Sequence, residues 1–151
     1  MNRLNQPAAV AVPASSRTGE AHRFLGLVVT GLVATGVAMV ATALAAALAR
    51  AVGVDFAMPD GGQTIPVAGI AVVTGFFSVV GLVLAVALLR LSAQPTRRFV
   101  QAAVALTAIS LVPPVLSGAD AATTVTLLGL HLVAAAVMIP TLARSLGTRS
   151  S

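Results

Sequence analysis

The amino-acid sequence predicts an all-α fold, an integral membrane bundle of four transmembrane helices. The first observation is composition, because 58% of the 151 residues are hydrophobic and only 9% are charged. An average soluble domain carries about 25% charged residues. The second observation is that four long segments, residues 24–49, 61–89, 99–119 and 121–143, contain no charged side chain. A bilayer core of about 30 Å requires about 20 apolar residues in a helix, and lipid offers backbone groups no alternative hydrogen-bond partner.

The elements follow from these segments in chain order. Residues 1–22 contain Pro7, Pro13, Ser15 and Ser16, and we expect a disordered cytoplasmic tail there. A transmembrane domain is expected over residues 23–144, and residues 145–151 should form a cytoplasmic C-terminal tail. The four spans should lie at about 24–49, 65–89, 99–116 and 121–143. The first span is much longer than the roughly 7–15 apolar residues of a signal peptide, so it is expected to stay in the protein.

Two proline sites should shape the last two spans. Pro113 and Pro114 lie near the end of the third span, and a proline inside a helix removes a hydrogen bond and bends or ends the helix. Pro140 lies within the last turns of the fourth span. It should leave the carbonyl of Ala136 without its helical partner.

The distribution of arginine predicts the orientation. All nine cationic side chains are arginines, and such residues accumulate on the cytoplasmic side of a membrane. The connection after the first span holds only Arg50, whereas the other arginines fall in the two termini and in the connection at residues 90–98. We therefore expect both termini to be cytoplasmic. The arginines on that side are Arg3, Arg17, Arg23, Arg90, Arg97, Arg98, Arg144 and Arg149.

His131 is the most informative polar residue of the predicted spans. It lies ten residues into the fourth span, or about 15 Å from the outer boundary at 1.5 Å per residue, which is close to the bilayer midplane. An ionisable side chain at that depth should face the bundle interior. The residues at similar predicted depth are Thr35, Ser78 and Thr107. This candidate midplane site serves either as structural hydrogen bonding between helices or as a proton or ligand contact.

A second candidate site lies on the opposite side from most arginines. Arg50, Asp55, Asp60 and Asp120 all fall in the two predicted outer connections. Asp60 and Asp120 each precede a span, where a carboxylate can cap the first N–H groups of a helix. Arg50 ends the first span, where a cation complements the helix dipole. The functional alternative is a shallow ligand or ion site.

Several functions are excluded or unsupported by the sequence. The chain has no cysteine and only two histidines, so no metal site and no cofactor is predicted. The net charge of +5 is spread over scattered arginines without interleaved aromatic residues, so no nucleic-acid partner is expected. The expected partners are the lipid bilayer and either further copies of the chain or a larger membrane protein.

Four motifs carry a resemblance to a known family. "RAVGVDF" at residues 50–56, "TIP" at 64–66 followed by Thr74, Arg90 closing the second span, and "HLVAAAVMIPTLAR" at 131–144 resemble an uncharacterised actinobacterial family of small four-helix membrane proteins. The resemblance extends over about residues 23–144. It implies a protein of the bacterial plasma membrane, and it transfers no catalytic residue, because that family is a domain of unknown function.

The sequence alone therefore favours a structural or accessory membrane component with no assigned enzyme activity. The alternative is a small oligomeric transporter or proton-coupled permease that uses His131 and the midplane hydroxyls. An outer-face membrane enzyme that uses the aspartates is the least supported function, because no acid–base pair can be identified from spacing.

Overall fold

The computed structural model describes residues 14–57 and 63–150. These residues form five α-helices and no strand beyond an isolated bridge between Ala57 and Thr64. The all-α fold class is therefore confirmed. The helices are α1 (Ala14–Ala51), α2 (Val67–Leu91), α3 (Pro95–Ser110), α4 (Val112–Leu116) and α5 (Ala121–Ser150).

Four helical segments are long and apolar enough to cross a membrane. They are Ala21–Ala51, Val67–Leu91, Pro95–Leu116 and Ala121–Thr148, with 31, 25, 22 and 28 residues. Each exceeds the roughly 20 residues that a bilayer core requires. The third segment combines α3 and α4, which the chain separates at Leu111. The break lies just before Pro113 and Pro114, where the sequence predicted that the span would bend or end. Pro140, by contrast, lies inside a continuous α5.

The helix boundaries differ from the expected ones mainly at the two ends of the chain. α1 begins at Ala14, within the segment expected to be a disordered tail, and α5 continues to Ser150, through most of the expected C-terminal tail. Once a helix has formed, each added residue gains a hydrogen bond without the cost of a new nucleus. A helix that spans the membrane can therefore extend beyond its apolar part. Residues 1–13 lie outside the described residues.

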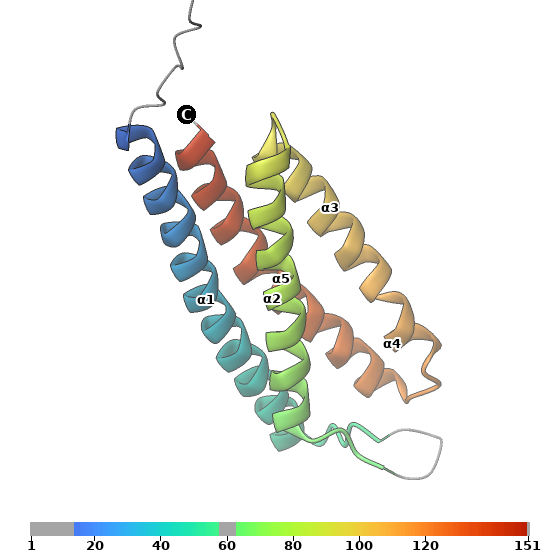
Figure 1. The fold of residues 1–151 in the computed structure, drawn as a ribbon. Helices are drawn as coiled ribbons and strands as arrows, with labels where there is room; N and C mark the ends of the chain where they lie inside the picture. The colour runs from blue at the N-terminus through green and yellow to red at the C-terminus, as the bar shows by residue number, and fades with distance from the viewer. Residues whose placement is uncertain (1–13, 58–62, 151) are drawn as a thin grey trace, which may run out of the picture.

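The bundle has two distinct ends. The start of α1, the α2–α3 connection and the end of α5 lie together at the top of Figure 1, and the other two connections lie at the bottom. We call the first the arginine end, because it holds Arg23, Arg90, Arg97, Arg98 and Arg144, and the second the loop end, which holds residues 52–57, 63–66 and 117–120. α1 packs against α2 and α5, whereas α3 packs against α5 and α2, and its backbone is not a direct neighbour of α1.

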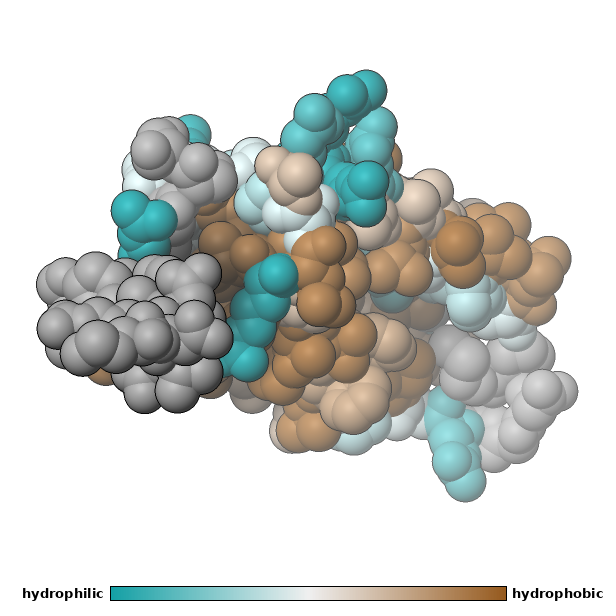
Figure 2. Space-filling model, turned by 45° about the horizontal axis from the view of Figure 1, so that its top comes forward, coloured by the Kyte–Doolittle hydropathy of each residue, from teal (hydrophilic) through white to brown (hydrophobic). Residues whose placement is uncertain are grey.

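The outer surface of the helices is apolar. Figure 2 shows hydrophobic residues over most of the visible flanks and hydrophilic residues toward the ends. Val33, Phe77 and Val104 are 63%, 65% and 54% exposed, although each lies well inside a long helix. Exposure of such a large apolar surface to water is unfavourable. Lipid or a second membrane protein is the environment that suits it.

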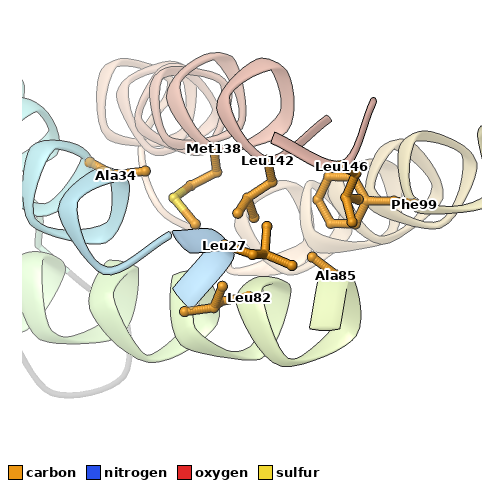
Figure 3. Packing of buried hydrophobic residues seen from close by; sticks show 9 residues of the cluster. Leu27, Ala34, Leu82, Ala85, Phe99, Met138, Leu142 and Leu146 are labelled. Atoms are coloured by element: carbon orange, nitrogen blue, oxygen red, sulfur yellow. The ribbon is translucent and has the colours of Figure 1, made fainter. Parts of the chain in front are cut away.

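The interior contains two apolar clusters (Figure 3 shows the larger one). Toward the arginine end, Leu27 lies among residues of α2, α3 and α5, and Phe99 packs beside Leu146. Toward the loop end, Phe56 packs with Ala46, Ile70 and Leu130. The larger cluster consists of Leu27, Ala34, Ala38, Leu82, Ala85, Phe99, Met138, Leu142 and Leu146.

Small residues allow α1 and α2 to approach closely. A Cβ atom at Gly31 would overlap the side chain of Leu82, and one at Gly75 would lie 2.7 Å from the sulfur of Met39. Close helix contact through glycine is typical of membrane bundles. Gly81, which shares a helix stripe with Thr74 and Ser78 in the sequence, has no atom within 4 Å of its Cβ position. The contact in α2 is therefore made by Gly75.

Candidate functional site

His131 is half-buried and hydrogen-bonds to its own helix. Its Nδ1 lies 2.7 Å from the carbonyl oxygen of Leu127, one turn earlier in α5. Because a carbonyl only accepts hydrogen bonds, Nδ1 must carry the proton. In a neutral imidazole Nε2 is then an acceptor with a lone pair. His131 lies ten residues beyond the start of α5, in the first half of that 30-residue helix.

The three hydroxyls expected at the same depth are distributed over separate helices. Thr35 is buried in α1 and donates to the carbonyl of Gly31 at 2.9 Å. Thr107 is half-buried in α3 and donates to the carbonyl of Ala103 at 2.8 Å. Ser78 is buried in α2. Within the described residues, none of the three forms a hydrogen bond with His131, so the structure does not bring the candidate midplane residues into one hydrogen-bonded site.

A hydroxyl pair connects two helices at another position. Thr42 of α1 and Thr74 of α2 lie with their Oγ1 atoms 3.2 Å apart, and Thr42 is fully buried. Thr42 also lies within hydrogen-bond distance of the carbonyls of Ala38 and Met39. Thr42 shares one helix face with Gly31 and Thr35, and Thr74 shares another with Ser78 and Gly81. Their pairing depends on the relative rotation of α1 and α2, for which the sequence has no direct signal.

Arg50 connects the end of α1 to the segment that precedes α2. Its guanidinium donates a 2.6 Å hydrogen bond to the carbonyl of Ile65 and lies 5.7 Å from the ring centroid of Phe56. Arg50 also stands in the last turn of α1, as predicted. The side chain therefore joins the end of α1 to the segment that leads into α2. Asp55 is exposed and forms no ion pair with Arg50 among the described residues.

Phe56 is the residue of this region that the sequence analysis did not single out. It is fully buried in the loop-end cluster, and its backbone φ is 52°, in the left-handed region. Such a φ is unusual for a bulky residue and costs about 1 kcal/mol or more. Phe56 is the only aromatic residue between α1 and α2, which is a weak signal in the sequence. Burial of its ring in the end of the bundle offsets the strained backbone.

Asp120 caps α5 in the manner predicted. Its Oδ1 accepts the backbone N–H of Thr123 at 3.0 Å, and its Oδ2 accepts the Thr123 hydroxyl at 2.7 Å. The hydroxyl hydrogen bond, followed by the backbone N–H, lowers the pKa of the Asp120 carboxyl below its ordinary value of 3.8. Thr123 is fully buried, so this cap positions the start of α5. Asp60, the remaining member of the outer cluster, lies outside the described residues.

The described residues form neither a metal-binding cluster nor a direct acid–base pair. Among residues 14–57 and 63–150, no three histidine, aspartate or glutamate side chains lie close enough together to hold a metal ion. His131 and Asp120 stand on one helix 11 residues apart, about 16 Å along its axis. They cannot act as a direct acid–base pair. The hydrogen bonds of Asp120 and Arg50 cap or join helices, and that between Thr42 and Thr74 joins α1 to α2.

Comparison with known proteins assigns no activity to these residues. A family model, described as a family of unknown function (DUF6069), matches residues 23–148. This match confirms the expected relation to a family without an assigned function. Among curated proteins and among solved structures, neither search gives a match.

Proposed function

We propose, for a chain that belongs to the DUF6069 family of unknown function, that it acts as a structural or accessory component of a membrane. In this proposal the four helices span a bacterial plasma membrane, with the arginine end in the cytoplasm. The outer faces of the helices contact lipid and either further copies of the chain or a larger membrane protein. No enzymatic step is included.

The observation that carries the proposal is the way polar side chains are satisfied inside the bundle. The hydroxyls of Thr35, Thr42 and Thr107 each donate to a carbonyl of their own helix. Apolar side chains surround these hydroxyls, because the larger cluster includes Ala34 and Ala38 on either side of Thr35 and the loop-end cluster includes Ala46, one turn after Thr42. Side chains arranged in this way stabilise a packed bundle and provide no continuous polar path between the two ends.

One observation favours the transporter alternative. The hydrogen bond from Nδ1 of His131 to Leu127 leaves Nε2 as an acceptor inside the predicted fourth span. An acceptor at this depth could take up a proton or a hydrogen bond from a transported molecule. In this alternative, a cavity between several copies of the chain would have to supply the polar path.

Purification from native membranes into lipid nanodiscs, without detergent, tests the proposal. We expect the 15.0 kDa chain to elute within a larger assembly whose other members, identified by mass spectrometry, are the same in repeated preparations. A chain that elutes alone, and that carries a proton or solute flux in vesicles which His131→Gln abolishes, would contradict the accessory function and support the transporter. The Thr126→Ala variant is the matched control, because Thr126 also bonds only to its own helix.

A further inference from the structure

A groove runs along the outer surface between α1 and α5, toward the arginine end. Its volume is about 320 Å³, and its walls include Val29, Val33 and Val37 of α1 and Val137 of α5. From Val29 to Val37 it extends over about 12 Å at 1.5 Å per residue. This length fits within one leaflet of a bilayer, about half of the 30 Å core.

The groove wall is apolar even where the sequence places hydroxyls. Thr30 and Thr141 both line it. The hydroxyl of Thr30 donates to the carbonyl of Gly26 at 2.8 Å, and that of Thr141 donates to the carbonyl of Val137 at 2.6 Å. Each hydroxyl is thus satisfied by its own helix. The surface suits a hydrocarbon chain, which has no hydrogen bonds to offer.

Two arginines lie in line with the groove at its arginine end. Arg23 precedes the groove residue Thr30 by seven positions, and Arg144 follows the groove residue Val137 by seven. Seven residues are almost two helical turns, so each arginine stands on the same face of its helix as the groove wall. Both side chains are exposed. Because α1 and α5 run in opposite directions, both cations lie at the same end of one apolar groove.

We propose that this groove binds an anionic phospholipid. One acyl chain lies against the valines between α1 and α5, and the phosphate group lies between Arg23 and Arg144. A long apolar surface with two cations at one end matches the amphiphilic form of such a lipid. Arginine suits phosphate recognition because its planar guanidinium can donate two parallel hydrogen bonds. A second copy of the chain would cover the valines, but its arginine end carries a single acidic residue, Glu20, among many arginines, so it suits these two cations less well than a phosphate does.

The arginine pair can be tested with a matched control of equal charge. Full-length protein in a neutral detergent is mixed with equal amounts of phosphatidylglycerol and phosphatidylcholine of the same chain length, and bound lipids are counted by native mass spectrometry. We expect wild type to retain phosphatidylglycerol preferentially. The Arg23→Gln/Arg144→Gln variant should lose this preference by roughly fivefold for each arginine. Arg97→Gln/Arg98→Gln removes the same charge from α3, which contributes no residue to the groove wall, and this variant should keep the preference.

The groove itself is tested by filling it. Val33→Phe places a ring in the groove at a residue that is 63% exposed, so the fold should tolerate it. Val83→Phe makes the same change on α2 at a residue that is 61% exposed and outside the groove. We expect the first variant to lower the number of retained phosphatidylglycerol molecules and the second to leave it unchanged, with helix content preserved in both.

Three results would overturn the lipid site. Equal loss of preference in the two double-arginine variants would show that general surface charge attracts the lipid. Unchanged lipid retention in Val33→Phe would place the acyl chain elsewhere. A dimer that Val33→Phe disrupts, without preferential phosphatidylglycerol in wild type, would assign the groove to a second copy of the chain.

Discussion

At the scale of single residues, most hydroxyls in the helices are bonded to the backbone one turn away. Thr30, Thr107 and Thr141 follow this pattern, with donor–acceptor distances between 2.6 and 2.8 Å. Lipid offers no water to a hydroxyl, and a carbonyl on the same helix is always within reach. Two polar residues on different helices therefore do not pair merely because they lie at a similar depth in the membrane. The Thr42–Thr74 hydrogen bond forms because α1 and α2 approach each other closely at that point.

The hydrogen bond of His131 predicts a small effect on stability. Its acceptor, the carbonyl of Leu127, belongs to the same helix, so His131→Leu removes no hydrogen bond between helices. We expect the free energy of unfolding in detergent to change by less than about 0.6 kcal/mol, the average value of an interhelical hydrogen bond in a membrane protein. A loss of about 2 kcal/mol or more would show that the imidazole joins helices in the membrane.

Asp120 predicts a dependence of stability on acid. Hydrogen bonds from Thr123 hold the pKa of its carboxyl below 3.8 in the folded protein. Its stabilising contribution is therefore complete above pH 3.8 and is lost as the pH falls through the lower folded-state pKa. Thermal unfolding followed by circular dichroism between pH 2 and 6 should show a loss of Tm at the acid end. Asp120→Asn should reduce this loss, and an identical acid profile in both proteins would contradict the assignment.

The capping role of Asp120 could be predicted from sequence because capping is local. An aspartate before an apolar run lies within reach of the next N–H groups whatever the rest of the fold does. The surroundings of His131 could not be predicted in the same way. They depend on the rotation of α5 and on which helices border it, and apolar residues on all sides of α5 give no direction to that rotation.

At the scale of elements, three features hold the described parts of the connection between α1 and α2, residues 52–57 and 63–66, in place. Gly53, at φ 95°, ends α1, and the N–H groups of Gly53 and Val54 bond back to the carbonyls of Arg50 and Ala49. This is the hydrogen-bond pattern of a Schellman motif. Arg50 then binds the carbonyl of Ile65, and Phe56 packs into the bundle. The result is a connection that closes the loop end.

Phe56 should contribute more to stability than a connection residue usually does. Removal of a buried aromatic side chain costs about 3–5 kcal/mol in soluble cores, and Phe56 is fully buried. We expect Phe56→Ala to lower the free energy of unfolding in detergent by about 3 kcal/mol. Val52→Ala is the control, because Val52 is 82% exposed and should cost less than about 0.5 kcal/mol. Equal effects of the two variants would mean that Phe56 does not close the bundle.

Two glycines of α1 provide a test of the α1–α2 contact. A side chain at Gly31 would overlap Leu82, whereas the Cβ position of Gly36 has no atom within 4 Å. Gly31→Leu should therefore force the helices apart at a cost of about 1–3 kcal/mol. Gly36→Leu should cost nothing in the isolated bundle. Unfolding in a graded series of denaturing detergent measures both, and the reverse order of stability would refute this helix contact.

The number and type of spanning elements could be predicted because uncharged segments of this length have one stable form in lipid. The boundaries were less predictable. α1 begins at Ala14 and α5 ends at Ser150, beyond the apolar segments, because charged residues leave the membrane without ending a helix. Burial of Phe56 could not be predicted either, since it depends on the space between α1, α2 and α5.

At the scale of the whole molecule, most of the described arginines lie at one end of the bundle. Arg23, Arg90 and Arg144 come from three helices and lie at the arginine end. The guanidinium of Arg90 also lies 4.6 Å from the ring centroid of Phe24, which joins α2 to α1. The loop end carries Arg50 as its only arginine among the described residues. Such asymmetry is the feature that orients membrane proteins.

Labelling of single cysteines in intact cells tests the membrane orientation most directly. The natural chain has no cysteine, so Gln63→Cys at the loop end and Ala93→Cys at the arginine end each introduce one thiol. A membrane-impermeant maleimide should label the thiol at residue 63 in intact cells. The thiol at residue 93 should react only after the membrane is opened, because arginines accumulate on the cytoplasmic side of a membrane. Labelling of residue 93 but not of residue 63 in intact cells would contradict the orientation, and equal labelling of both in intact cells would contradict a membrane-spanning bundle.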